Sequence, residues 1–344
     1  MARAIVAALF VAAGIPLTAS PGAAGPLSCG QVVTQSVTLT ADVGPCANDA
    51  IVVGADNVTV DLNGRVVSGV VRKGRYGIWS KNHTGVVVTT GRVTGFDVGV
   101  VIEGGARNTV QQIDAYDNIG RFELSNFGGG ILVLTSSDNV VQDSRAIHNG
   151  PLAGIEVAGV SLRNVIQRND SSYNNVLAPL DRSEDKGINV QGLSKDLVPA
   201  FTTVQYNRVV GNGNSGIFIG GFVNDSRIMN NVVQGNGHTW RDEDQPGAGI
   251  EIGPRSFRNL VQSNVVYESG GDGFLIRTTV SISPPTLGNR IVGNAFLESD
   301  QFFGTSTWPA ADITDGNRYC NSGGDVFMGN RFGTSTFVGS DCIH

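Results

Sequence analysis

Two stretches, residues 170–186 and 232–248, concentrate charged and aromatic side chains that could bind and protonate a polyhydroxy molecule. Their candidate site residues are the aromatic Tyr173 and Trp240, the basic Arg182, Lys186, His238 and Arg241, and the acidic Asp185. Aromatic rings can stack on a sugar ring, and charged groups can orient hydroxyls or transfer a proton. Solvated surface loops contain the same residue types, so the positions of these side chains decide between the two interpretations.

Three further candidates, Glu156, Asn189 and Glu251, each lie two residues after a glycine in a recurring Gly-apolar-x signature. Taken over all copies of the signature, this position predicts one outward row of side chains, in the order Trp79, Val101, Leu132, Glu156, Asn189, Phe218, Glu251 and Leu275. A lyase needs a base and a partner for the sugar carboxylate. Glu156, Asp185 and Asn189 could supply part of the six to eight oxygens that Ca²⁺ prefers, with Lys186 or Arg182 nearby as the base. No cofactor is required by the sequence, and Ca²⁺ is the ion that this set could hold.

A glycosidase is the other enzyme class that these residues could serve. It needs two carboxyl groups about 5–9.5 Å apart. Glu156 with Asp185, or Glu251 with an acid from residues 242–244, could meet that requirement. The catalytic candidates common to both classes are Glu156, Asp185, Lys186, Glu251 and His238.

The elements that must position these residues are the strands of a repeat. A β-branched residue recurs at spacings of 22 or more, and Asn follows three residues later in six of nine copies. The nine positions are Val60, Val88, Val110, Val141, Ile166, Val204, Ile228, Val261 and Ile291. Such units must stack to bury their apolar side chains. A leucine-rich repeat would show more Leu and a helical side, so the pattern favours an all-β, single-stranded, right-handed parallel β-helix solenoid of about ten coils.

Stacking in register predicts where each column of side chains lies. Successive coils are about 4.8 Å apart, so Asn207 and Asn231 should lie in an interior amide ladder. Arg92, Asp114, Arg145, Asp170 and Arg208 should form an outer ladder of alternating charge. Glu156 and Glu251 should be three coils, about 14 Å, apart. Loop length can be counted from the residue three positions after each β-branched repeat position to the next Gly-apolar-x signature. The long loops in this count are 65–76, 114–129, 170–186 and 232–248, which predicts a cleft along one edge beside Glu156.

The chain ends and the composition restrict the cellular setting. Arg3, an apolar run to Leu17 and small residues up to about position 24 predict a signal peptide at 1–24. A net charge of −6 disfavours a nucleic-acid partner, and no later segment is long enough to span a membrane. We therefore expect a secreted or extracytoplasmic monomer. Its β-helix domain, 25–344, would comprise an N-terminal cap (25–56), repeat coils (57–300) and a C-terminal cap (301–344).

The sequence resembles the right-handed parallel β-helix proteins of the pectate-lyase-like superfamily, including secreted bacterial proteins with NosD-like repeats. The residues that carry this resemblance are Cys29-Gly30, the stretch 37–40, Gly44-Pro45-Cys46 and the stretch 56–64. The resemblance implies a saccharide held beside the long-loop edge. From their residue types and places in the chain, the residues expected to bind it are Tyr173, Arg182, Asn189, Trp240 and Arg241. Scattered histidines give no metal-ligand spacing, which disfavours a copper role.

The resulting prediction is a protein that binds and cleaves an extracellular polysaccharide, as a lyase or a glycosidase. The alternative is a non-catalytic structural or cell-envelope β-helix. Because the two cysteine pairs would lie at opposite ends of a long stack, and a disulfide needs Cα atoms within about 7 Å, we expect Cys29 to pair with Cys46 and Cys320 with Cys342.

Overall fold

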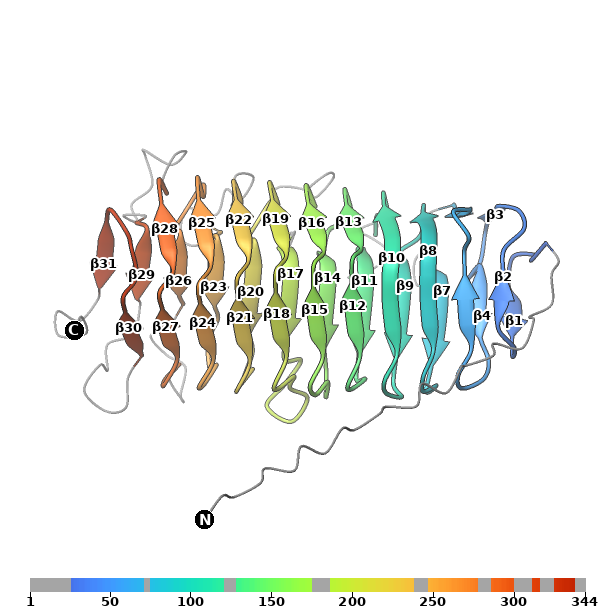
Figure 1. Ribbon diagram of the computed structural model, residues 1–344, viewed down its shortest axis with the longest axis horizontal. Coiled ribbons are helices and arrows are strands. Elements are labelled where there is room, and N and C mark those ends of the chain that lie inside the picture. The colour runs from blue at the N-terminus through green and yellow to red at the C-terminus, as the bar shows by residue number, and fades with distance from the viewer. Residues whose placement is uncertain are drawn as a thin grey trace, which may run out of the picture.

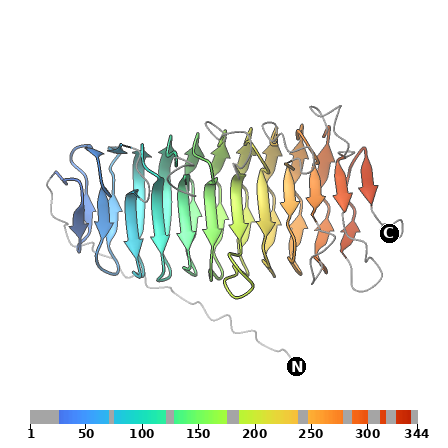
Figure 2. The same ribbon diagram turned by 180° about the vertical axis from the view of Figure 1, so that it is seen from behind.

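The computed structural model describes residues 26–70, 75–120, 128–174, 186–237, 247–277, 286–299, 311–315 and 325–337. These residues form 31 strands and no helix, and they contain no segment able to cross a membrane as a helix. All strand pairs of the coils are parallel, and the coils stack along the long axis of the molecule from β1 to β31 (Figure 1). Seen from behind, the colours follow the same order, so each coil lies beside its sequence neighbours (Figure 2).

One face of the stack is a sheet of twelve strands, called sheet A below. Its strands are β1 (Gln31–Val33), β4 (Ile51–Val53), β7 (Tyr76–Lys81), β9 (Val98–Glu103), β11 (Gly129–Leu134), β14 (Ala153–Ala158), β17 (Lys186–Gln191), β20 (Ile217–Gly220), β23 (Ile250–Ile252), β26 (Phe274–Ile276), β29 (Ile313–Asp315) and β31 (Ser335–Phe337). The recurring Gly-Ile-x-Val signature forms the central strands of this sheet.

The second face begins at the β-branched repeat positions. Its strands are β2 (Val37–Thr38), β5 (Thr59–Asp61), β8 (Val87–Thr94), β10 (Thr109–Tyr116), β12 (Val140–Gln142), β15 (Val165–Gln167), β18 (Thr203–Gln205), β21 (Arg227–Met229), β24 (Leu260–Gln262), β27 (Arg290–Val292) and β30 (Val326–Met328). The middle residue of each short strand points inward, and Val141 and Ile166 have no exposed surface.

The third face includes strands that lie within the stretches predicted to be long loops. Its strands are β3 (Val43–Cys46), β6 (Val66–Gly69), the second halves of β8 and β10, β13 (Arg145–Ile147), β16 (Asp170–Ser172), β19 (Arg208–Val210), β22 (Val232–Gln234), β25 (Val265–Tyr267) and β28 (Ala295–Leu297). The stretches 65–76, 114–129, 170–186 and 232–248 were predicted to be loops throughout, which is wrong, because each contains one of these strands. Strands of about three residues carry too little alternation to be recognised individually.

Inward side chains of the three faces form one continuous core of mainly Val and Ile. The predicted amide ladder lies at a corner of this core and is confirmed. Asn207 donates from Nδ2 to Oδ1 of Asn231 at 3.0 Å, and Asn231 donates to Asn264 at 2.9 Å. A side-chain amide suits this place because it pairs buried backbone groups that the sharp turn leaves without a strand partner.

Two more amide ladders lie at the other corners, and the sequence pattern alone had not revealed them. Relative to each β-branched position, the three columns fall two residues before, three after and eight after. Their asparagines are Asn108, Asn139, Asn164, Asn259 and Asn289; Asn169, Asn207, Asn231, Asn264, Asn294 and Asn330; and Asn118, Asn149, Asn174, Asn212 and Asn236. Each of the three corners of the coil is therefore stabilised by a column of stacked side-chain amides.

The outer charge ladder is confirmed for two of its steps. Arg145 contacts Asp114 at 3.4 Å, and Arg208 contacts Asp170 at 3.1 Å, both across neighbouring coils. Their exposed position makes such pairs worth about 0–1 kcal/mol each. This ladder therefore contributes little to the stability of the stack.

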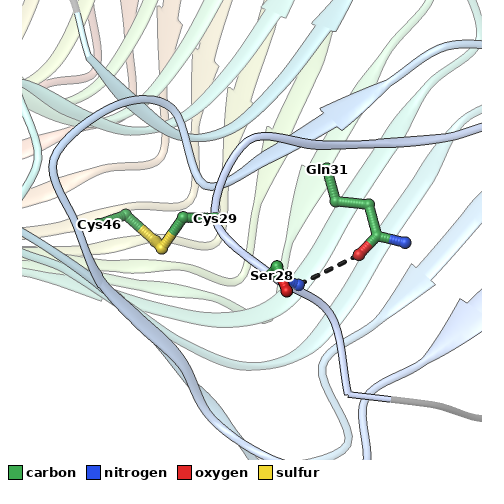
Figure 3. Close-up of a disulfide and its surroundings, with 4 residues drawn as sticks. All are labelled: Ser28, Cys29, Gln31 and Cys46. Atoms are coloured by element: carbon green, nitrogen blue, oxygen red, sulfur yellow. Dashed lines mark hydrogen bonds between the residues drawn. A yellow bond between two sulfur atoms is a disulfide. The ribbon is translucent and has the colours of Figure 1, made fainter.

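The N-terminal disulfide is also confirmed. Cys29 and Cys46 are bonded, with Cα atoms 5.5 Å apart (Figure 3). Beside it, the backbone N–H of Ser28 donates to Oε1 of Gln31 at 3.1 Å. The bond joins Cys29, two residues before β1, to Cys46, the last residue of β3, and so closes the first coil covalently. Cys320 and Cys342, like the predicted signal peptide 1–24, lie outside the described residues, and the division into caps and repeat coils stays a prediction.

Candidate functional site

The outward side chains of sheet A hold the predicted site row. On β14, Ile155 and Val157 point into the core, so Glu156 between them points away from it. Strand register places the row across the sheet in the predicted order. Its members are Trp79, Val101, Leu132, Glu156, Asn189, Phe218, Glu251 and Leu275. Three strand steps separate Glu156 from Glu251, about 14 Å.

Glu156 and Asn189 are in contact on neighbouring strands. Asn189 donates from Nδ2 to Oε1 of Glu156 at 3.2 Å and to Oε1 of Gln191 at 3.0 Å. Although it points away from the core, Glu156 is buried: 6% of Glu156 and none of Asn189 is exposed. Oδ1 of Asn189 is buried and has no hydrogen-bond partner in the described structure. A carboxylate in such a place keeps its charge only through its neighbours.

Lys186 extends over the same face from the start of β17. It is 6% exposed, and its Nζ lies 4.2 Å from the centre of the Phe218 ring. That ring lies over two glycines: a Cβ on Gly220 would fall 2.1 Å from it, and a Cβ on Gly253 would fall 2.7 Å from it. The glycines thus let Phe218 lie flat on the sheet, where its face partly offsets the desolvation of the ammonium group.

Glu251 forms a separate buried ion pair. Arg277 donates from Nε to Oε1 of Glu251 at 2.6 Å, and Ser215 donates from Oγ to Oε2 at 2.5 Å. Burial by itself would raise the pKa of Glu251. Arg277, the Ser215 hydroxyl and the charge of Lys186 together outweigh burial and lower that pKa below its ordinary value. Glu251 is therefore a carboxylate with both oxygens engaged.

The structure brings together only part of the predicted site. Glu156, Lys186, Asn189 and Glu251 share the outward face of sheet A. Tyr173 does not: it follows β16 at the corner, is 46% exposed, and packs edge-on against His148 with ring centres 6.1 Å apart. The other predicted residues, Arg182, Asp185, His238, Trp240 and Arg241, lie outside the described residues.

The described residues do not form a calcium site. They contain no group of three or more His, Cys, Asp or Glu side chains placed to hold a metal ion. Glu156 and Asn189 together offer fewer oxygens than the six to eight that Ca²⁺ requires, and the Asn189 amide turns its nitrogen toward the carboxylate. The chemistry available here is that of carboxylate, amide and ammonium groups.

Two members of the site were missed by sequence reasoning. Glu251 is contacted by Arg277, which directly follows the neighbouring strand β26, and by Ser215, which lies two residues before β20. Arg277 lies two residues after Leu275 of the predicted row, so the outward alternation of sheet A could have indicated it. Ser215 carried no such signal.

Comparison with known proteins agrees with this architecture. A family model described as "Right handed beta helix region" matches residues 42–197. The chain has the fold of a right-handed parallel β-helix. Among curated proteins, none matches the chain by sequence.

Solved structures share the fold of this β-helix at low sequence identity. The Dettilon tailspike protein gp208 is 13% identical with a TM-score of 0.57, and the match covers 89% of this chain and 60% of the tailspike. Pectate lyase Pel9A is 12% identical with a TM-score of 0.56, covering 87% and 70%. The alginate lyase from Paenibacillus sp. str. FPU-7 is 14% identical with a TM-score of 0.50, covering 95% and 94%. At these identities the likeness shows the fold alone.

Proposed function

We propose that this β-helix binds a polysaccharide at the outward face of sheet A and processes it by proton transfer at Glu156. The observation that carries the proposal is the cluster of Glu156, Asn189 and Lys186, which is buried on the face that points away from the core. Burying ionisable groups is costly unless they are paired, and such clusters on a concave or covered face are candidate functional sites. The named relatives, a pectate lyase and an alginate lyase among them, support the substrate class.

The described residues favour one-carboxylate chemistry, because they offer Glu156 only Glu251 as a second carboxylate of the row. The predicted partners, Asp185 for Glu156 and an acid of 242–244 for Glu251, lie outside the described residues. The separation of Glu156 and Glu251, about 14 Å, exceeds the 5–9.5 Å of glycosidase carboxyl pairs.

Glu251 is held ionised by Arg277, so we assign it to positioning that arginine rather than to proton transfer. Glu156 would then move the proton, and Lys186 would stabilise negative charge that develops on the sugar. This division suits elimination or epimerisation next to a sugar carboxylate.

An extracytoplasmic location fits the same proposal. The disulfide between Cys29 and Cys46 is typical of oxidising compartments. A solved relative with a TM-score of 0.51 is a periplasmic alginate epimerase. The signal peptide at 1–24 belongs to this proposal as well.

One observation favours a second candidate function, that of a non-catalytic envelope β-helix. Glu156, Lys186, Asn189 and Glu251 are each 6% exposed or less. A substrate reaches them only if what lies over the cluster is displaced. A polar network that is never uncovered would instead fix the packing over sheet A.

A screen of the purified full chain on uronate and neutral glycans tests the two candidates. Ultraviolet absorbance detects the unsaturated products of elimination, an increase in reducing ends detects hydrolysis, and proton exchange from water into the sugar detects epimerisation. The proposal predicts a signal in the first or third assay with at least one uronate polymer. No signal in any assay across the panel would contradict it and favour the envelope role.

A further inference from the structure

The N-terminal half of the sheet A face carries an aromatic and charged cluster away from Glu156. Tyr76 and Trp79 of β7 pack edge-on with ring centres 5.7 Å apart. Trp79 donates from Nε1 to Oε2 of Glu103 on β9 at 3.1 Å. Lys81 contacts Oε1 of the same carboxylate at 2.8 Å, and its Nζ lies 5.5 Å from the centre of the indole ring.

The indole is held in one orientation by its surroundings. Trp79 and Tyr76 pack on a small apolar cluster that is separate from the main core and consists of Val98, Val101 and Leu132. The cluster fixes one end of the ring system and Glu103 fixes the indole N–H. An aromatic group that is already ordered loses little entropy when a ligand stacks on it.

The aromatic and charged side chains of Trp79, Lys81 and Glu103 are more accessible to solvent than the buried charged groups around Glu156. The side chain of Lys81 is 50% exposed and that of Glu103 is 27% exposed. Trp79 and Tyr76 are half-buried. Hydrogen-bonding groups and an aromatic surface are thus within reach of a ligand from solvent.

The charges around the cluster favour a ligand without negative charge. Asp49, Asp97 and Glu103 lie around Tyr76, against the cations Arg75 and Lys81. Burial first, and then Asp97, Glu103 and Asp49, raise the pKa of Tyr76, while Arg75 opposes them. Among the residues that the structure describes, these three acids and two bases leave an excess of one negative charge, which disfavours a uronate.

We propose that Trp79, Lys81 and Glu103 form a binding subsite for a neutral sugar residue, three strands from Glu156. The indole face would take the C–H face of the ring. Glu103 would accept a hydrogen bond from a sugar hydroxyl, and Lys81 would donate one to another. The inference rests on the proposed polysaccharide function for the nature of the ligand, but it uses none of the residues assigned to proton transfer.

The test follows the fluorescence of Trp79 in a full-length chain whose other tryptophans are replaced, Trp240→Phe and Trp308→Phe. Titration with neutral oligosaccharides should give a saturable change. Matched uronate oligosaccharides and the Glu103→Gln variant should each bind about tenfold more weakly, the scale of one lost charge-assisted hydrogen bond. Arg92→Gln, an exposed substitution on another face of the stack, should leave the titration unchanged. Far-UV circular dichroism confirms that Glu103→Gln retains the β-helix.

The outcomes separate this subsite from the proposed function. Saturable binding without turnover of any glycan would support the subsite and contradict the catalytic role of Glu156. Glycan binding by affinity electrophoresis with no change in Trp79 fluorescence would overturn the subsite alone. Equal affinity for uronate and neutral ligands, or equal affinity of Glu103→Gln and its parent, would overturn it as well.

Discussion

Replacing Asn231 by Leu removes the centre of one amide ladder, and the structure allows the cost to be worked out. The Asn231 side chain accepts from the backbone N–H of Asn207 at 2.9 Å and from its Nδ2 at 3.0 Å. It donates to the carbonyl oxygen of Val204 at 3.0 Å and to Oδ1 of Asn264 at 2.9 Å. Leu has a similar volume but can make none of these four bonds.

The greatest cost comes from the backbone N–H of Asn207, which loses its acceptor while it stays buried. One such group costs about 1–3 kcal/mol, and a net hydrogen bond contributes about 1 kcal/mol. We therefore expect Asn231→Leu to lower the free energy of unfolding by about 2–4 kcal/mol. The measurement is the midpoint of urea unfolding, followed by far-UV circular dichroism.

Gln205→Leu is the matched control, because it removes an amide from the outer face of the coil that contains Asn207. Gln205 donates to Gln167 at 2.9 Å in a half-buried position, where water can replace the bond. Its effect should stay within about 0.5 kcal/mol. Equal shifts of the unfolding midpoint in the two variants would show that the interior ladder does not stabilise the fold as described.

Three further changes have defined outcomes. The double substitution Cys29→Ser and Cys46→Ser should destabilise the chain by about 3 kcal/mol, because the disulfide closes a loop with a sequence separation of 17; a melting temperature that responds to neither the substitutions nor a reductant would contradict this. The pKa of Glu251 in the folded chain is lowered from its ordinary value of 4.5. The ionised Glu251 therefore stabilises the folded state above pH 4.5, and this stabilisation is lost as the pH falls through the lower pKa of the folded state. Thermal melts should therefore show a gap between wild type and Glu251→Gln that is widest at neutral pH and closes in acid, and a gap that widens in acid would reverse the assignment. Asp143→Asn removes an exposed pair with Arg168, whose atoms lie 2.7 Å apart, and should not shift the melting temperature measurably; a large drop would show that these corner pairs hold the coils together.

The fold was predictable because stacking forces equivalent residues into columns. A β-branched residue followed three positions later by Asn recurs wherever a coil passes the same corner, so Val204 with Asn207 and Ile228 with Asn231 indicate one geometry. The two ladders that lie two residues before and eight residues after the β-branched position were missed, although their spacing from that position is equally constant. Their columns contain Ser and Thr as well as Asn, for example Thr202 and Ser226, and this variation weakens the pattern.

The candidate site was only partly predictable. Alternation along a strand tells which side Glu156 faces, and the row from Trp79 to Leu275 was correct for that reason. Alternation does not tell what lies over that side, so the burial of Glu156 and Asn189 could not be inferred. The contact of Arg277 with Glu251 joins residues 26 positions apart in different coils, and only the register of β23 and β26 brings them together.

The central claim is that Glu156 on the outward face of sheet A processes a polysaccharide, and turnover by Glu156→Gln tests it most directly. The substitution keeps the volume and an acceptor for Asn189 but removes the proton-transferring carboxylate. With the glycan identified by the screen, Glu156→Gln should lose nearly all turnover. The exposed Arg92→Gln on another face should match wild type. Wild-type turnover by a folded Glu156→Gln protein would contradict the claim.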